Sequence, residues 1–532
     1  MMMALLAIFI SSPGDSVGWT KWDVQWASGQ TGWQVWYDGS CTHVDFVEAH
    51  GPISCRGCAY NFKRADNWLG SMKVNSEVSN YATIGIKPFN NAAVCCYHMW
   101  RIGDIYRSWV AVDETQGGYV FTERPVLPQN TTDIIIWPRL AVDDRGNFHV
   151  VMHGYTMYMS FYTRSTDDGV SWSDTLIINP DTGYCINESS GVFADRFDNP
   201  GKIIIYWTRW TGEGSMGVVQ HAQDIWYMVS TDYGETWGGK INITNYQPSD
   251  TMRAFCHVKA IIDRDGDPHI VFPTLYFVNQ TPYNRSWIMH WSPKTGFSVV
   301  TGPHRMTNVP GAWRLPCDFP NISLDRDNGW LYCTYVLNRD SDISQGGWPN
   351  GEIMGKYSTD NGLSWISAAL GDTGVNLTKT PTPGAPPGEC CDDDYPSIHP
   401  YVEKINDKKH LIISYLEDKD AGSYIAGEGT ETDNPYRVYF CPAESIIGVS
   451  QKHDERLTDL RIPGLIYGNL LRLSGLKDPA RVKILDVLGR EVITQTVSPQ
   501  HTSIDLSHLT SGVYFLLVGK DRSGLHKFVL IR

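Results

Sequence analysis

Short apolar stretches alternate with compact polar turns along most of the chain, a pattern that predicts many β-strands and few helices. In the range 138–151 (PRLAVDDRGNFHVV), two apolar runs flank a polar turn that ends in Gly146. Similar stretches begin at Val258, Pro320 and Pro396. Because turn residues separate two β-rich runs in each case, we expect each stretch to be an antiparallel hairpin.

A second turn, written S-T-D-x-G-x-[ST]-W, occurs three times, starting at Ser165, Ser230 and Ser358. The first two starts lie 65 residues apart and the last two 128, so a decayed copy is expected near Ser292. The aspartate can close the turn through backbone N–H groups, the glycine allows positive φ, and the tryptophan packs on the following strand. Because every copy carries it, the aspartate is interpreted as scaffold and not as a catalytic residue.

The two kinds of turn together give each repeat two hairpins, and therefore four antiparallel strands. Five such units begin near residues 137, 189, 257, 319 and 395, and 81–121 is a degenerate sixth. Repetition at a fixed period indicates a repeat architecture. We therefore predict an all-β fold, a six-bladed β-propeller over residues 70–450. A linear solenoid is the alternative, but these strand groups lack a capping repeat.

Composition narrows the possible partners of this chain of 532 residues. Its net charge of −14 argues against nucleic acid, which needs a basic surface, and no apolar run is long enough to span a membrane. Residues 1–16 resemble the later part of a signal peptide, with a start that lies further upstream. Residues 17–69 are rich in Trp and Cys; they either close the ring or cover it.

Twelve cysteines in an exported chain predict disulfides, although the sequence does not give their pairing. The alternative is a zinc site at Cys55 and Cys58 with His43, His50 and His98. No cofactor is expected. Structural calcium is possible at the Asp263-Arg-Asp-Gly-Asp turn, which lacks the bidentate glutamate of an EF-hand and is otherwise interpreted as a turn former.

The S-x-D-x-G-x-[ST]-W turns resemble the Asp-box, or BNR repeat, of sialidases and related propellers. The resemblance covers about residues 130–445 and implies a propeller fold. Asp-boxes also occur in other hydrolases, in lyases and in binding proteins, so the resemblance specifies fold better than activity.

The end of the chain carries a second resemblance. The elements Asp486-Val-Leu-Gly-Arg, Leu509-Thr-Ser-Gly-Val-Tyr and Lys527-Phe-Val-Leu-Ile-Arg are similar to the C-terminal sorting domain of the type IX secretion system. This implies a small β-sandwich at 465–532 behind a linker at 451–464, type IX machinery as a partner, and a secreted or surface location. An ordinary β-sandwich module with another role is the alternative.

The alternation of strand direction places both kinds of turn at one end of the propeller, called here the turn pole. The longer loops and the links between blades lie at the other end, the loop pole, where binding residues usually lie on a rigid scaffold. The residue four positions before the turn aspartate also differs from blade to blade. We therefore expect this residue to line the mouth of the central channel of the propeller. These arguments predict ligand-binding residues at His153, Tyr155, Arg209, Trp210, Lys259, Arg285, Asn321 and Trp348. Ordinary solvated loops are the alternative.

Catalytic candidates follow from the resemblance to sialidases. It implies three arginines that hold a carboxylate, a tyrosine nucleophile and an aspartate as acid or base, which differs from the two-carboxylate scheme of most glycosidases. The usual F/Y-R-I-P motif is absent, so the candidates are chosen by predicted pole and residue type: Arg139, Arg253, Arg314, Asp318, Asp393 and Tyr395.

The sequence therefore predicts an exported propeller that acts on a glycan or glycoprotein, as a sialidase-like hydrolase or a relative of polysaccharide lyases. The alternative is a non-catalytic propeller that binds glycans or proteins. A hydrolase needs an acid and a nucleophile in one pocket, and these are expected near Arg139.

Overall fold

The chain divides into two compact units, Met1–Ile447 and Gly448–Arg532, which are described separately. The structure is a computed structural model. It describes residues 11–25, 32–75, 77–100, 106–128, 134–154, 159–179, 189–212, 220–369, 371, 373–448, 465–467, 469–473, 479–486, 490–499, 502–518 and 525–531.

The first unit consists of groups of antiparallel strands. The first group is β2 (Val35–Tyr37), β3 (Thr42–Glu48), β4 (Gly57–Arg64), β5 (Asn67–Trp68) and β6 (Met72–Lys73). The second is β7 (Ser79–Ile86), β8 (Ala93–Met99), β9 (Arg107–Asp113) and β10 (Phe121–Pro125). The third is β11 (Ile135–Val142), β12 (Phe148–Gly154), β13 (Ser160–Ser165) and β14 (Leu176–Asn179).

The next two groups are joined by a single pairing between Gln223 and Ala254. The fourth is β15 (Ser190–Ala194), β16 (Ile203–Trp210), β17 (Gln223–Ser230) and β18 (Ile241–Asn242). The fifth is β19 (Met252–Ala254), β20 (Lys259–Ile262), β21 (Pro268–Val278), β22 (Thr281–Ser292) and β23 (Gly296–Arg305).

The last two groups complete the unit. The sixth is β24 (Cys317–Asp325), β25 (Trp330–Leu337), β26 (Glu352–Ser358) and β27 (Val375–Asn376). The seventh is β28 (Asp392–Ile398), β29 (Glu403–Ile405), β30 (Lys408–Asp418), β31 (Asn434–Pro442) and β1 (Asp15–Thr20). Helical turns are short: Ile53–Cys55, Tyr424–Ala426 and α1 (Glu444–Ile447).

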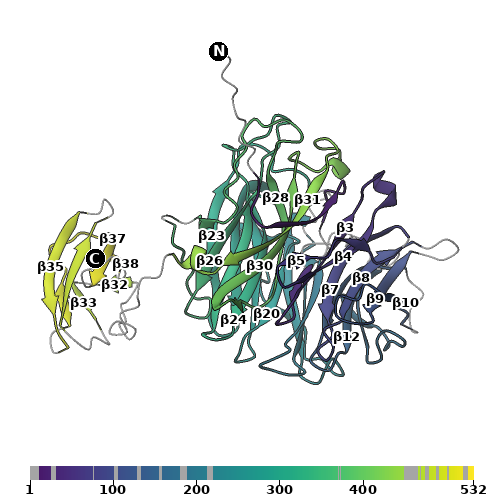
Figure 1. The fold of residues 1–532 in the computed structure, drawn as a ribbon. Helices are drawn as coiled ribbons and strands as arrows, with labels where there is room; N and C mark the ends of the chain where they lie inside the picture. Colours follow the sequence, from purple (N-terminus) through teal and green to yellow (C-terminus); the bar gives the residue numbers. More distant parts are fainter. Residues whose placement is uncertain are drawn as a thin grey trace, which may run out of the picture. The chain divides into compact units, whose positions relative to one another are not determined.

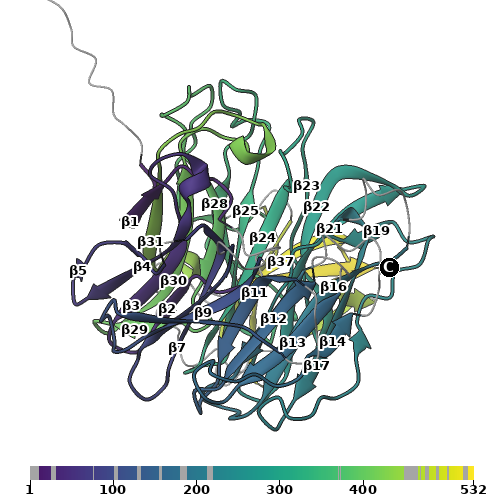
Figure 2. The ribbon, with the colours of Figure 1, turned by 90° about the vertical axis from the view of Figure 1, so that its right-hand side faces the viewer.

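These groups form a closed ring of blades. Strands of neighbouring blades contact one another in the order β3, β7, β11, β15, β20, β24, β28, and β2, the innermost strand of the first blade, contacts both β7 and β30. The Gln34 backbone N–H donates to Ser397 Oγ at 3.0 Å and joins the first blade to the last. Figures 1 and 2 show the blades side by side. The propeller prediction is confirmed. The described strands make seven blades where the repeats alone indicated six, because the segment whose role the sequence left open builds the first blade.

The N-terminal segment also closes and fills the ring. Strand β1 pairs with β31, so the start of the chain supplies the outer strand of the last blade. Trp33 lies in the centre and is only 1% exposed. Its carbonyl accepts from Ile84 N–H at 2.7 Å, and Lys259 Nζ lies 3.8 Å from its ring centroid. Phe193 packs beside it at 5.8 Å between ring centroids. Trp33 therefore contacts blades two, four and five at once.

The repeated tryptophan-ended turns have nearly identical hydrogen bonds. In the first copy, Ser165 Oγ accepts from Gly169 N–H at 2.8 Å, and Asp167 accepts from the N–H and hydroxyl of Ser171. The copies at Ser230 and Ser358 repeat these bonds. The carboxylates of these aspartates therefore accept the hydrogen bonds that close the turns, in agreement with their interpretation as scaffold.

A second repeated network lies inside the blades. The imidazole of His149 bridges the Asp143 carboxylate at 3.0 Å and the Tyr162 hydroxyl at 2.8 Å. Blade one repeats this arrangement with Asp38, His43 and Tyr60, and blade five with Asp263, His269 and His290. The turn aspartates thus hold histidines of the next strand, which accounts for their burial without invoking calcium.

The second unit is a small β-sandwich. Its five-stranded sheet has the order β32 (Leu465–Tyr467), β38 (Leu525–Ile531), β37 (Gly512–Val518), β34 (Ala480–Leu485), β35 (Glu491–Val497), and β33 (Leu470–Arg472) pairs with β36 (Ser503–Asp505). Its own apolar core includes Leu471, Val482, Ile504, Leu516 and Phe528. Across the described residues of the whole chain, none of the helices has the length and apolar character required to cross a membrane.

We predict that Trp33→Ala lowers the free energy of unfolding by about 3–5 kcal/mol, because it leaves a cavity at the axis where several blades meet. Urea denaturation followed by tryptophan fluorescence would measure the change. The matched control is Trp19→Ala on β1, where the side chain is 49% exposed and the expected change is about 0.5 kcal/mol. Equal losses in both variants would contradict the central role of Trp33.

Candidate functional site

Four innermost strands, β7, β11, β24 and β28, each bend at an aromatic residue close to the loop pole, where the strand begins. Tyr81, Trp137, Phe319 and Tyr395 have φ of 60°, 52°, 49° and 51°, and the pairing register skips two residues at each. Positive φ is unusual for aromatic side chains and often marks a functional site. Proline follows three of them, so the repeated aromatic–Pro pairs are the signal in the sequence that marks these bends.

The bends place aromatic rings next to one another around the mouth. The ring centroids of Tyr81 and Trp137 are 6.0 Å apart, and those of Phe319 and Tyr395 are 5.2 Å apart. His257 stacks on Phe319 at 4.5 Å. Tyr81 and Trp137 are half-buried, so part of each side chain reaches the surface. Sugars bind such rings through their apolar C–H faces.

The first group of polar residues at this mouth, called the histidine cluster, consists of His98, Tyr106, Arg139 and His153. His98 is the next-to-last residue of β8 and Tyr106 immediately precedes β9, and the His98 Nε2 atom lies 3.1 Å from the Tyr106 hydroxyl. The Trp137 backbone N–H donates to His98 Nδ1 at 3.3 Å. In the neutral ring, Nε2 therefore carries the proton and donates to the Tyr106 oxygen.

Burial sets the charge state of this cluster. It lowers the pKa of His98 well below its usual range, and the positive charges of Arg56 and Arg139 lower it further. Burial and the positive charge of Arg139 also lower the pKa of His153 well below its usual range. Both imidazoles are therefore neutral at pH 7. Burial also raises the pKa of Tyr106, so its hydroxyl keeps its proton.

Arg139 lies at the base of this cluster, on β11. Its guanidinium is fully buried and donates to the Trp137 carbonyl. Burial lowers its pKa to about 9, so it stays cationic at neutral pH. His153 Nε2 lies 3.1 Å from Ser190 Oγ, and the ring of His153 is 5.9 Å from that of Trp137. Arg139 and His153, predicted separately from the sequence, thus lie in one cluster.

The second group, called the Arg314 cluster, is a buried set of carboxylates around one arginine. Arg314 NH1 donates to Asp392 Oδ2 at 2.7 Å, and NH2 lies 2.5 Å from Asp394 Oδ2. Asp23 and Asp418 act electrostatically on the same groups. Burial raises the pKa of Asp394 to about 7 and that of Asp23 to about 6, while Arg314 opposes both shifts.

Two further catalytic candidates lie beside this cluster and one faces away from it. The Tyr395 ring centroid is 5.8 Å from the Arg314 guanidinium. Asp318 pairs with His257 Nδ1 at 2.7 Å. Asp393 points to the opposite face of β28, because side chains alternate along a strand, and accepts from Thr380 Oγ1 at 2.7 Å.

The three predicted arginines do not share partners. Arg253 donates to the backbone carbonyls of Gln247, Asp250 and Met252 at 2.7 to 2.9 Å, which makes it a support for its own loop. Arg139 and Arg314 have the separate surroundings described above. The three arginines are therefore held by different groups.

The remaining predicted binding residues have varied positions. Lys259 and Asn321 are buried at the axis, where Lys259 donates to the Gly32 carbonyl and Asn321 to the Pro396 carbonyl. They fill the channel and do not line an open mouth, because the N-terminal segment occupies it.

Arg209 lies 5.5 Å from the Trp226 ring centroid, and Arg285 lies 5.4 Å from that of Tyr276. Trp210 and Trp348 are half-buried, and Tyr155 lies outside the described residues.

The cysteines contradict one expectation. All eleven in the described residues are free thiols, so the predicted disulfides are not formed among them. The proposed zinc set is also not assembled, since Cys55 is exposed, His43 pairs with Asp38, and His50 pairs with Glu48.

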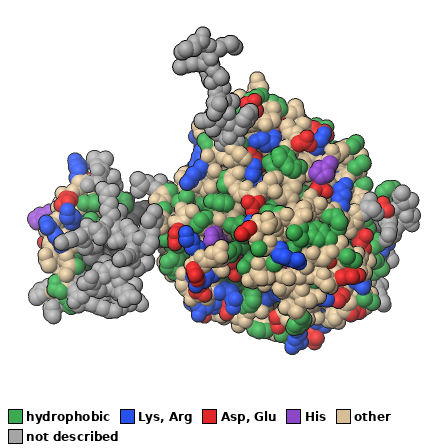
Figure 3. Space-filling model, viewed as in Figure 1, with side chains coloured by type: hydrophobic (Ala, Val, Ile, Leu, Met, Phe, Trp, Pro, Cys, Tyr) green, Lys and Arg blue, Asp and Glu red, His purple; other side chains and the backbone are tan. Residues whose placement is uncertain are grey.

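On the face seen in Figure 3, basic and acidic side chains are interspersed.

Comparisons with known proteins identify the C-terminal unit. Residues 470–532 match the family described as secretion system C-terminal sorting domain, which confirms the predicted sorting domain and export to the cell surface or exterior. No curated protein sequence matches the chain.

Several solved structures are similar to the chain at low identity. A polysaccharide lyase, ulvan lyase, is 12% identical, with 82% of this chain and 95% of that one covered and a TM-score of 0.49. A Hadza microbial sialidase is 11% identical over 74% of both chains, with a TM-score of 0.38. An α-L-arabinanase of Penicillium chrysogenum is 12% identical over 68% of this chain and 93% of that one, with a TM-score of 0.37.

We predict that Asp394 makes stability depend on pH. Its pKa is about 7 when folded against an ordinary 3.8, so the folded state keeps a proton that the unfolded state releases. The contribution is fully present below about pH 4 and is lost as pH rises to about 7. Urea denaturation across this range should show a smaller loss in Asp394→Asn than in the wild type. Asp407→Asn, whose side chain is 95% exposed, is the control. An unchanged pH profile in Asp394→Asn would contradict the assignment.

Proposed function

We propose that this chain is an exported carbohydrate-active enzyme that cleaves an acidic polysaccharide at the histidine cluster. The observation that carries the proposal is the pair formed by neutral His98 and the Tyr106 hydroxyl beside two arginines. Arginines suit the carboxylate of a uronic acid, and the half-buried rings of Tyr81 and Trp137 suit the faces of its sugar rings.

The arrangement supports β-elimination. His153, neutral because its pKa is lowered, takes the proton from C5 of the uronic acid. The electron pair left at C5 forms the C4–C5 double bond, and the C4–O bond breaks. Tyr106 donates its proton to the leaving oxygen, and the His98 Nε2–H, hydrogen-bonded to the Tyr106 oxygen, stabilises the phenolate until solvent returns a proton to it.

Arginine side chains assist this step through charge. Abstraction of the C5 proton places negative charge on the substrate carboxylate, which a cation stabilises. Arg56 is half-buried at the mouth, and its guanidinium lies 4.2 Å from the Trp22 ring centroid. We assign binding of the substrate carboxylate to Arg56. The positive charge of the buried Arg139 adds to the electrostatic attraction.

Sialidase-like hydrolysis at the Arg314 cluster is the second candidate. It is favoured by Asp394, whose pKa of about 7 leaves a large protonated fraction at neutral pH, beside Tyr395. An acid and a tyrosine nucleophile would then lie on neighbouring residues of β28. We rank it second because Arg314 is already paired with two aspartates, which leaves it less available to a substrate carboxylate.

We predict that Tyr106→Phe and His153→Gln each reduce the elimination rate by about 10²–10⁴-fold, the usual contribution of a general acid or base. The purified chain would be screened on uronic-acid polysaccharides by the ultraviolet absorbance of the new double bond, and on fluorogenic sialosides. Tyr283→Phe, at a side chain 49% exposed on β22, is the matched control and should keep full activity.

The outcomes separate the candidates. Cleavage of sialosides that is lost in Asp394→Asn and kept in Tyr106→Phe would replace elimination by hydrolysis. Binding of acidic glycans with no cleavage of either class would show a non-catalytic glycan-binding propeller.

A further inference from the structure

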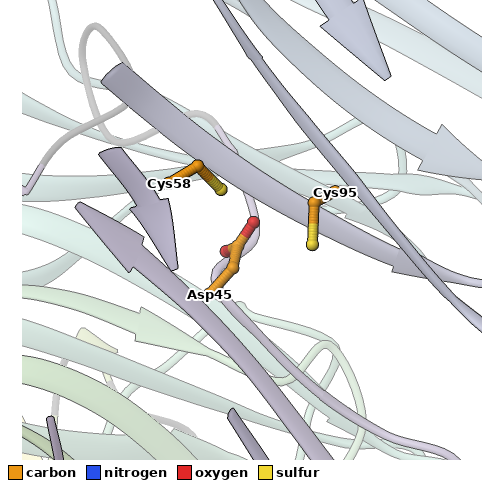
Figure 4. Close-up of side chains that lie close together, drawn as sticks. All are labelled: Asp45, Cys58 and Cys95. Atoms are coloured by element: carbon orange, nitrogen blue, oxygen red, sulfur yellow. The ribbon is translucent and has the colours of Figure 1, made fainter. Parts of the chain in front are cut away.

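A buried carboxylate and two thiols converge between the first two blades and have no role in the proposed reaction. They are Asp45 on β3, Cys58 on β4 and Cys95 on β8, and each is 0% exposed. One ligand atom of each lies within 4.8 Å of the others. Figure 4 shows the carboxylate pointing toward the space between the two sulfur atoms.

The surroundings of this sulfur cluster are apolar. The layer between the blades contains Val47, Phe62, Ala82 and Ile84 among other buried hydrophobic residues. Both oxygens of the Asp45 side chain lack a hydrogen-bond partner. A buried polar group without a partner costs roughly 2–7 kcal/mol, and a buried charge costs more unless it is paired or bound to a metal. A bound cation would supply the partner that both oxygens of Asp45 lack.

We propose that Asp45, Cys58 and Cys95 bind one zinc ion that ties blade one to blade two. Two thiolates and one carboxylate are ligands that zinc accepts, and their mutual spacing suits three corners of a tetrahedron, with a water molecule in the fourth position. Thiolates select zinc over calcium or magnesium, which prefer oxygen ligands only.

A disulfide between Cys58 and Cys95 is the competing explanation. It would join the same two blades but leave the Asp45 carboxylate buried without a partner, whereas a cation compensates the carboxylate and the thiolates together. The position of Asp45 therefore favours the metal. The inference does not depend on the proposed function, since the cluster lies within the inter-blade packing.

We predict about one zinc per chain in protein purified without chelator, measured by mass spectrometry of the metal. Asp45→Asn and Cys95→Ser should each lose most of it. The matched control is Cys55→Ser, which changes the exposed cysteine of the Cys55-x-x-Cys58 pair and should retain zinc. Chelation of the wild type should also lower the melting temperature, with a smaller effect in Cys95→Ser.

Each outcome decides the proposal. Absence of zinc in the wild type, a Cys58–Cys95 disulfide in non-reducing peptide mapping, or full zinc retention in both Asp45→Asn and Cys95→Ser would overturn it. If those variants fail to fold, cobalt substitution of the wild type decides: sulfur-to-cobalt charge-transfer absorption supports the site, and its absence refutes it.

Discussion

The ring depends on the packing of each tryptophan-ended turn against the third strand of the preceding blade. The turn glycine has positive φ, and a Cβ added to Gly169 would lie 2.8 Å from Val110 of the blade before it. Gly234 meets Tyr162 and Gly362 meets His290 in the same way. The tryptophans complete the contact, since Trp237 packs on Tyr162 and Trp365 on His290. A single turn sequence thus fixes both the hairpin within one blade and its distance from the next.

Such contacts hold only if the ring is closed, and closure comes from the start of the chain. Strand β1 completes the last blade, while Trp33 fills the axis against side chains of distant blades. Two remote parts of the sequence therefore have to meet before the inner strands are fully buried. Once they do, strands such as β8, β12 and β24 are buried along their whole length and become a rigid frame.

The rigid frame makes the charged mouth possible. Bends at four aromatic residues lie close to where the inner strands begin, and the His98, Tyr106, Arg139 and His153 side chains come together beside two of them, Tyr81 and Trp137. Taking Arg314 and its aspartates out of water is costly, and packing elsewhere must offset that cost. Buried charged groups with shifted pKa values cluster at functional sites and also occur in structural ion-pair networks. Both clusters lie at the pole opposite the repeated turns, where the loops differ from blade to blade.

The sequence alone determined the local structure, because hairpin turns and strands follow from residues close together in the chain. The spacing of the S-T-D-x-G-x-[ST]-W copies predicted the propeller and its two poles, and the last residues predicted the sorting domain. Arg139 was predicted as a site residue because its position in the inner strand differs from blade to blade, and His153 was predicted because it lies at the loop pole.

Only the tertiary structure decided which distant residues meet. The first blade carries no copy of the turn motif, so its strands were not predicted from the repeat. His98, considered only as a zinc ligand, pairs with Tyr106, and Asp45 meets Cys95 across two blades. Arg253 donates hydrogen bonds to carbonyl groups of its own loop, whereas Arg314 pairs with Asp392 and Asp394. Such pairings depend on which strands face each other across the ring, and that information is spread over the whole chain.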